Sequence, residues 1–239
     1  MSRRRLLIVN ADDFGQSSGI NCGIIRAHRF GIVTSTSLMV RQNAVVEAVE
    51  LSRTCPDLSL GLHVDFGEWR LHDGEWVALY EVVSLSDTQA VREEVARQLA
   101  AFRHIVGRDP THIDSHQHIH LREPVREIVG MCARELAVPL RRCNSKIQYC
   151  GDFYGLGPDG LPLPDPISIE GLIGILTRLP PGITELCCHP ATGADLETMY
   201  LAERSRELDV LCTPRIREAI ANLEITLCSF QEVRACPRL

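Results

Sequence analysis

Short apolar runs alternate with amphipathic stretches along the whole chain of 239 residues. The apolar runs predict buried strands at residues 6–10, 35–40, 58–63, 111–116, 138–141, 183–189 and 224–228. Apolar residues at helical spacing predict helices at 19–30, 44–53, 91–106, 124–136, 168–179, 194–208 and 214–223. Ser86 and Gln89 have the spacing of a capping box before the third of these helices. Strands that alternate with helices are typical of right-handed βαβ units around a parallel sheet.

Seven strands and about as many helices predict an α/β fold close to a TIM-like (β/α) barrel, in one domain covering residues 1–239. An open doubly wound sheet is the alternative, but no glycine-rich nucleotide motif follows a strand. Two connections are long, at residues 64–85 and 142–166, and the first contains a candidate hairpin with an Asp-Gly turn at residues 71–76. Long ordered loops in such a fold usually shape a ligand site.

Composition narrows the possible partners. The chain has 25 basic and 31 acidic residues, a net charge of −6, and Lys146 is its one lysine. This balance offers no basic stripe for nucleic acid. The first apolar run, residues 6–9, is too short for a signal peptide, and no stretch is long enough to span a membrane, so we expect a cytoplasmic protein. A chain of this size can bury enough surface to fold without metal, so any metal is expected to be functional.

Ten Cys and nine His are distributed differently along the chain. The Cys are scattered without a C-x-x-C pair, which predicts small buried apolar residues and no thiolate metal site. Four of the His lie between positions 112 and 120. In that segment His and Asp occupy alternate positions, namely His112, Asp114, His116, His118 and His120. On an extended strand all five would face one way, which favours a polar, metal-binding cavity over a solvated edge strand.

Polar residues also stand at three other predicted strand ends. Asp12 and Asp13 follow the first strand, His63 ends the third, and His189 ends the sixth. Asp before Gly is common turn chemistry and a single His at a strand end is often structural, but catalytic residues of barrels cluster at these ends. Adjacent side chains on a strand point in opposite directions, so Asp12 and Asp13 can serve one site only if the backbone leaves extended geometry at Asp13.

Such a set of groups suits metal-assisted hydrolysis of an amide or an ester. Two imidazoles and a carboxylate can hold an ion that acidifies water and polarises a carbonyl. A second carboxylate can act as general base, and a further His can protonate the leaving group. The sequence shows neither a Gly-x-Ser-x-Gly elbow nor a plausible Cys nucleophile.

These segments resemble the YdjC-like carbohydrate deacetylases, a group that includes chitooligosaccharide and hopanoid-associated deacetylases. The resemblance rests on LLIVNADDFG (6–15), GIVTST (31–36), GLH (61–63), THIDSHQHIH (111–120), CHPA (188–191) and ELDVL (207–211). It implies a deformed (β/α) barrel, a divalent ion such as magnesium or zinc, and removal of an N-acetyl group from a sugar with release of acetate. A homodimer is also an expectation, because members of the family are often dimers.

Residue by residue, the resemblance implies metal ligands Asp13, His63 and His116. It makes Asp12 the general base and His189 the acid or oxyanion partner. His118 and His120 would line the sugar pocket or support the ligands, and Asp114 could orient a ligand imidazole through its ring N–H.

The resemblance has departures that bear on the substrate. Residues 64–69 differ from the usual family sequence, so chitobiose in particular is not supported. Aromatic residues in the two long loops could stack on sugar faces, namely Trp69, Trp76, Tyr149, Phe153 and Tyr154. Another metal-dependent amidohydrolase or phosphoesterase, or a catalytically silent metal-binding protein, are the alternatives. Binding alone needs only one carboxylate, so the presence of both Asp12 and Asp13 argues against a silent protein.

Overall fold

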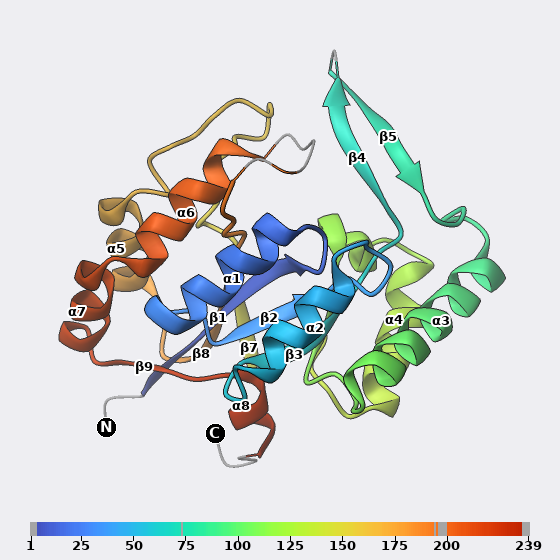
Figure 1. Ribbon diagram of the computed structural model, residues 1–239, viewed down its shortest axis with the longest axis horizontal. Coiled ribbons are helices and arrows are strands. Elements are labelled where there is room, and N and C mark those ends of the chain that lie inside the picture. The colour runs from blue at the N-terminus through green and yellow to red at the C-terminus, as the bar shows by residue number, and fades with distance from the viewer. Residues whose placement is uncertain (1–3, 73, 194, 196–199, 236–239) are drawn as a thin grey trace.

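The computed structural model describes residues 4–72, 74–193, 195 and 200–235. The strands are β1 (Arg5–Phe14), β2 (Ser35–Leu38), β3 (Ser59–Val64), β4 (Gly67–His72), β5 (Glu75–Glu81), β6 (Ile113–Ser115), β7 (Ile147–Cys150), β8 (Gly182–Cys188) and β9 (Ile225–Leu227). The helices are α1 (Ser18–Phe30), α2 (Val45–Arg53), α3 (Thr88–Val106), the 3-10 helix η1 (His116–Leu121), α4 (Val125–Glu135), α5 (Ile169–Arg178), α6 (Ala202–Cys212), α7 (Pro214–Asn222) and α8 (Phe230–Ala235). Helices surround a curled sheet, and a hairpin projects from one end (Figure 1).

The main sheet is parallel, and its strands follow one another in the order of barrel staves. β1 pairs with β8 on one side and with β2 on the other, and the order along the sheet is β6-β3-β2-β1-β8-β7. A bridge from Ile113 to Leu140 continues the sheet one step beyond β6. This order confirms the predicted deformed barrel. A doubly wound sheet would instead reverse its strand order at a switch point, so that alternative is wrong.

The connections around the barrel differ in two places from the prediction. The strand expected at 138–141 shortens to the single bridge at Leu140, whereas β7 forms inside the connection expected to be a loop. β9 pairs only with the first residues of β1, from Arg5 to Leu7. β9 therefore extends the sheet at the end opposite the polar residues.

Alternation along β1 separates an outer apolar layer from the barrel interior. Leu7, Val9 and Ala11 join the core beneath the surrounding helices. Ile8 instead belongs to a small cluster inside the barrel, with Ile147, Ile183, Cys228 and Phe230. α8 carries Phe230 and lies at the end of the molecule where both termini are found (Figure 1). The barrel therefore has an apolar floor, and the residues that follow toward the carboxyl ends of its strands are polar.

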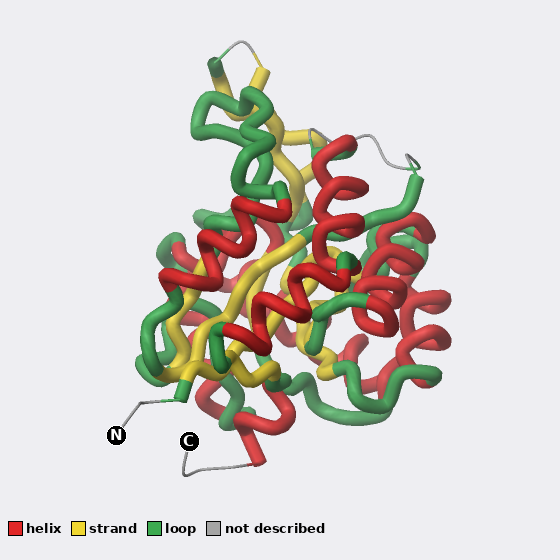
Figure 2. Tube along the Cα trace, turned by 90° about the vertical axis from the view of Figure 1, so that its left-hand side faces the viewer, coloured by secondary structure: helices red, strands yellow, loops and turns green. Residues whose placement is uncertain are grey.

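The hairpin predicted at residues 71–76 is confirmed and is longer than expected. β4 and β5 pair in antiparallel fashion from Gly67–Glu81 to His72–Glu75, and Asp73 of the predicted turn lies outside the described residues. The base of the hairpin is bound to Gln117 of η1. The Gln117 side-chain amide donates to the Trp69 carbonyl at 2.7 Å and accepts from the Trp69 N–H at 3.0 Å. The tube view shows the hairpin standing above the carboxyl end of the sheet (Figure 2).

Two helix starts differ from the prediction. Asp87, not Ser86, caps α3, because its carboxylate accepts from the N–H groups of Gln89 and Ala90 at 3.0 Å. The helix expected at 194–208 is α6, which begins at Ala202, and residues 194 and 196–199 of that range lie outside the described residues. Among the helices of the described residues, none combines the length and apolar character needed to cross a bilayer.

Candidate functional site

The end of β1 turns so that two successive carboxylates enter the same site. Asp13 has a φ of 69°, in the left-handed region, and the pairing of β1 with β2 shifts between Ala11 and Phe14. A non-glycine residue rarely adopts this conformation. The predicted departure from extended geometry at Asp13 is thereby confirmed, and both Asp12 and Asp13 are buried.

Asp13 lies between the imidazoles of His63 and His116. Its Oδ1 is 3.3 Å from Nε2 of His63 and 2.9 Å from Nδ1 of His116, while Oδ2 accepts from Arg204 at 2.6 Å. Burial opposes ionisation, but the charges of Arg204 and His116 hold the pKa of Asp13 well below its usual range. Sequence reasoning missed Arg204, because it comes from α6, far along the chain from β1.

Asp114 contacts the His63 ring at the nitrogen expected from the family resemblance. The Oδ1 of Asp114 is 2.7 Å from Nδ1 of His63, which leaves Nε2 directed at Asp13. The donor atoms of Asp13, His63 and His116 lie within 4.8 Å of one another, and all three residues are buried. One carboxylate and two imidazoles, with a carboxylate behind one imidazole, are a donor set that fits a divalent metal ion.

Arg141 links three buried carboxylates inside the barrel and was not among the predicted site residues. It donates to both oxygens of Asp12, at 2.6 and 2.7 Å, to Asp114 at 2.8 Å and to Glu185 at 2.7 Å. Burial alone would raise the pKa of Asp12, but the charge and hydrogen bonds of Arg141 outweigh it and the pKa is lowered. Asp12 is therefore an ionised carboxylate in a fixed orientation.

The His-rich segment is not an extended strand beyond Ser115. The chain enters η1 at His116, and Gln117 and His118 have φ values of 49° and 55°. The prediction that residues 112, 114, 116, 118 and 120 face one way is therefore wrong, because left-handed residues break the two-residue alternation.

The remaining predicted histidines of this segment have different surroundings. His118 lines the cavity, and its Nε2 is 3.0 Å from the Tyr149 hydroxyl. His120 is fully buried, and its ring nitrogens contact the Ser115 hydroxyl at 2.7 Å and the carbonyl of Arg141 at 3.1 Å. It therefore supports the Arg141 backbone and is not among the residues that line the cavity to which His118 belongs.

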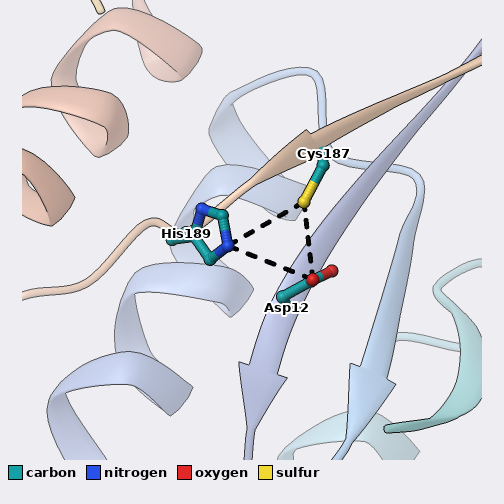
Figure 3. A group of neighbouring side chains, drawn as sticks. All are labelled: Asp12, Cys187 and His189. Atoms are coloured by element: carbon teal, nitrogen blue, oxygen red, sulfur yellow. Dashed lines mark hydrogen bonds and ion pairs between the residues drawn. The ribbon is translucent and has the colours of Figure 1, made fainter. Parts of the chain in front are cut away.

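Asp12, Cys187 and His189 form a second group of neighbouring side chains (Figure 3). Cys187 donates from Sγ to Asp12 Oδ2 at 3.4 Å, and Sγ is 3.8 Å from Nε2 of His189. Nε2 of His189 is 4.0 Å from Asp12, and Nδ1 is 3.8 Å from Glu207. His189 thus approaches the predicted base, as the sequence led us to expect.

The interpretation of the cysteines as small buried apolar residues is wrong for three of them. Cys22 and Cys143 are exposed, and the thiol of buried Cys187 faces polar groups of the site. Glu185, Cys187 and His189 occupy alternate positions toward and past the end of β8, and this two-residue period was the available signal. The apolar neighbours of Cys187 in the sequence led us to expect a core residue at this position.

Both groups open into one cavity of about 630 Å³ at the carboxyl ends of the strands. Asp12, Asp13, His63, His116 and His189 all line it. Aromatic side chains from the hairpin, from β7 and the connection after it, and from just before α6 form much of its wall, namely Trp69, Trp76, Tyr149, Phe153, Tyr154 and Tyr200. The prediction that the two long connections shape a ligand site is consistent with this lining.

Comparison with known proteins identifies relatives along nearly the full chain. The chitooligosaccharide deacetylase of Serratia marcescens is 32% identical, with 96% of this chain and 99% of that protein aligned. The chitooligosaccharide deacetylase of Klebsiella pneumoniae (strain 342) is also 32% identical, and that of Yersinia pestis (strain Pestoides F) is 33% identical over 95% of this chain and 98% of that protein.

Solved structures agree on the fold. A crystal structure from Enterococcus faecalis V583, assigned provisionally to cellobiose-phosphate cleavage, matches with a TM-score of 0.76 and 24% identity over 96% of this chain and 99% of that one. The Bc1960 peptidoglycan N-acetylglucosamine deacetylase matches with a TM-score of 0.58 and 11% identity, over 96% and 87% of the two chains. The family model described as "YdjC-like protein" matches residues 6–222, and the chain therefore belongs to the YdjC-like protein family.

Proposed function

We propose that the protein is a metal-dependent hydrolase that removes an N-acetyl group from a sugar or glycoconjugate and releases acetate. The observation that carries this proposal is that Asp12 and His189 line the same cavity as the cluster of Asp13, His63 and His116. A buried carboxylate that can act as base, an imidazole and three potential metal ligands therefore line one cavity. The deacetylase relatives support the same reaction.

Asp13, His63 and His116 would hold one divalent ion, with magnesium and zinc as the candidates. Such an ion supplies Lewis-acid chemistry, since it polarises a carbonyl group and lowers the pKa of water. Asp114 would keep the His63 ring in place through the 2.7 Å contact at Nδ1. Arg204 would fix the other oxygen of Asp13, at 2.6 Å.

Asp12 would take a proton from the water that attacks the acetyl carbonyl. Arg141 keeps that carboxylate ionised and oriented, with one guanidinium nitrogen on each oxygen. His189 would donate a proton to the nitrogen as the C–N bond breaks, which gives acetate and an amino sugar. Glu207 lies on the other side of this ring, with its Oε1 3.8 Å from Nδ1 of His189.

The cavity wall suits a carbohydrate. Sugar rings have apolar faces that pack against aromatic rings, and Trp69, Trp76 and Tyr154 are among the residues that line this cavity. His118, paired with Tyr149, supplies polar contacts on one side of the cavity. The identity of the sugar, the homodimer and the cytoplasmic location stay predictions.

The experiment that tests this function is measurement of acetate release from a panel of N-acetylated sugars, including N-acetylglucosamine and chitooligosaccharides. The purified protein is assayed before and after removal of metal by a chelator, and again after addition of magnesium, zinc or cobalt. We expect release from at least one sugar, loss on chelation and recovery with a divalent ion. If the protein binds no divalent ion and none supports acetate release, the proposed mechanism is wrong.

A further inference from the structure

We propose that Asp12, Cys187 and His189 form a second cation site, selective for Zn²⁺ and other ions that prefer thiolate, and that its occupation stops catalysis. Binding at this site follows from the residues themselves. The inhibitory effect rests on the proposed function, in which Asp12 and His189 are needed free.

The three donor atoms already form a triangle of the right size. Its edges are 3.4 Å from Cys187 Sγ to Asp12 Oδ2, 3.8 Å from Sγ to His189 Nε2, and 4.0 Å from Nε2 to Oδ2. Tetrahedral zinc with ordinary Zn–S, Zn–N and Zn–O bonds places such donors about 3.3–3.6 Å apart. A contraction of about 0.7 Å or less along any edge is therefore sufficient.

The backbone that carries the site is held on both sides. β1 and β8 are neighbours in the sheet, and Asn10 and Ala11 pair with Cys187 and Cys188. Asp12 and Cys187 are each 3% exposed, whereas the His189 side chain is 19% exposed and borders the cavity. A fourth coordination position would therefore open toward the cavity, which is the space that the substrate needs.

The donor types distinguish this site from the first one. A sulfur ligand favours zinc over magnesium, whereas Asp13, His63 and His116 offer only oxygen and nitrogen. The second ring nitrogen of His189 is buried without a hydrogen-bond partner, and Oε1 of Glu207 lies 3.8 Å from it, so a small shift of the ring would bring the two into the contact by which carboxylates support histidine ligands of zinc.

The local charge also accepts a cation. The buried carboxylates around the two groups are Asp12, Asp13, Asp114, Glu185 and Glu207, and the buried guanidinium groups beside them are Arg141 and Arg204. Arg141 already binds Asp12, but an ionised carboxylate has about four acceptor positions and can serve a guanidinium and an ion together. On binding, the Cys187 thiol loses its proton to solvent and the sulfur bonds to the ion as thiolate.

The test is a zinc and cobalt titration of the metal-free protein, in the wild type, in Cys187→Ser and in the matched control Cys188→Ser. Cys188 is the next residue of β8 and is also buried, but its Sγ contacts the carbonyl of Asn10 and not Asp12. We expect a second equivalent of Zn²⁺ in the wild type and in Cys188→Ser, and its loss in Cys187→Ser. A thiolate-to-cobalt charge-transfer band should follow the same pattern.

X-ray absorption at the zinc edge of the wild type checks the ligands without a substitution. One sulfur neighbour is expected at the second equivalent. Binding of a single equivalent by the wild type, or a second equivalent without sulfur or retained by Cys187→Ser, overturns the site.

Acetate release supported by magnesium is measured in parallel, each protein being compared with its own zinc-free rate. Zinc should slow the wild type and Cys188→Ser by about a hundredfold or more, since the base is withdrawn, and should slow Cys187→Ser far less. Equal inhibition of all three proteins overturns the inhibitory role. If no acetylated sugar is hydrolysed at all but the sulfur-ligated ion binds, the proposed function fails and the second site stands.

Discussion

Arg141 donates hydrogen bonds to both carboxylate oxygens of Asp12, at 2.6 and 2.7 Å, from inside the barrel, where it is only 3% exposed. The same guanidinium reaches Asp114, which in turn contacts His63 at 2.7 Å. The proposed base and the support of the proposed metal ligands therefore belong to one buried network. A change at one member should affect stability, metal binding or turnover according to what that member touches.

Replacement of Arg141 by Met should destabilise the protein by about 3–5 kcal/mol, because three buried carboxylates lose their shared cation. Chemical denaturation measures the change in the free energy of unfolding. Arg103→Met is the control, since Arg103 pairs with Asp109 at the surface and such pairs contribute about 1 kcal/mol or less. Equal effects of the two substitutions would show that the buried network does not stabilise the fold.

Asp114→Asn should weaken binding of the first divalent ion by about 10- to 100-fold, because the amide cannot orient and polarise His63 as the carboxylate does. Calorimetric titration of the metal-free protein gives the affinity. Asp65→Asn is the matched control: Asp65 is equally buried but contacts Tyr80 and Gln42 at the base of the hairpin. An unchanged affinity in Asp114→Asn would contradict the role given to this carboxylate.

Glu185 should make stability depend on pH in a defined direction. Burial raises its pKa from 4.5 to about 7, against the opposing charge of Arg141. Between these values the folded protein holds the Glu185 proton more tightly than the unfolded chain, so this contribution to stability is present at low pH and is lost as the pH rises. The melting temperature of the wild type minus that of Glu185→Gln should therefore fall between about pH 5 and about pH 8.

Glu170→Gln serves as the control for this series, because Glu170 is an exposed residue of α5. The difference in melting temperature between the wild type and Glu170→Gln should stay nearly constant across this pH range. A difference between wild type and Glu185→Gln that grows with pH would mean that Glu185 is ionised and stabilising in the folded protein.

Trp76→Ala should raise KM for the sugar by about 2- to 10-fold, the loss expected for one aromatic contact. Trp76 lines the cavity from β5 and is 64% exposed. Metal affinity should not change, since the metal-type donors lie on other elements. Leu79→Ala is the control, because Leu79 is an exposed residue of the same strand that does not line this cavity. An equally large rise in KM in Leu79→Ala would show that Trp76 does not contact the sugar.

Much of the site could be predicted because barrel chemistry gathers at strand ends. Asp12, Asp13, His63 and His189 each follow an apolar run, and their convergence needed only the strand order. The departure from extended geometry at Asp13 followed from the requirement that two adjacent carboxylates share one site, although its left-handed form did not. The orienting contact of Asp114 was expected from the resemblance to the YdjC-like family.

Other parts could not be predicted, because they depend on contacts between distant segments. Arg141 binds carboxylates on β1, β6 and β8, and no local pattern identifies such a residue. Gln117 and His118 are not glycines, so their left-handed conformation has no signal in the sequence and η1 resembled a strand. Cys187 was interpreted as a core residue because its neighbours in the sequence are apolar. Its spacing of two residues from His189 was the signal that could have placed it in the site.

The assignment of Asp12 as base and His116 as metal ligand is tested most directly by comparing Asp12→Asn with His116→Ala. Two quantities are measured on the same samples: the first equivalent of bound divalent metal and the rate of acetate release. Asp12→Asn should keep that metal and lose turnover by about 10²- to 10⁴-fold, because only the base is removed. His116→Ala should lose both. Loss of the first metal equivalent in Asp12→Asn, or its retention with undiminished turnover in His116→Ala, would contradict the assignment of base and ligands.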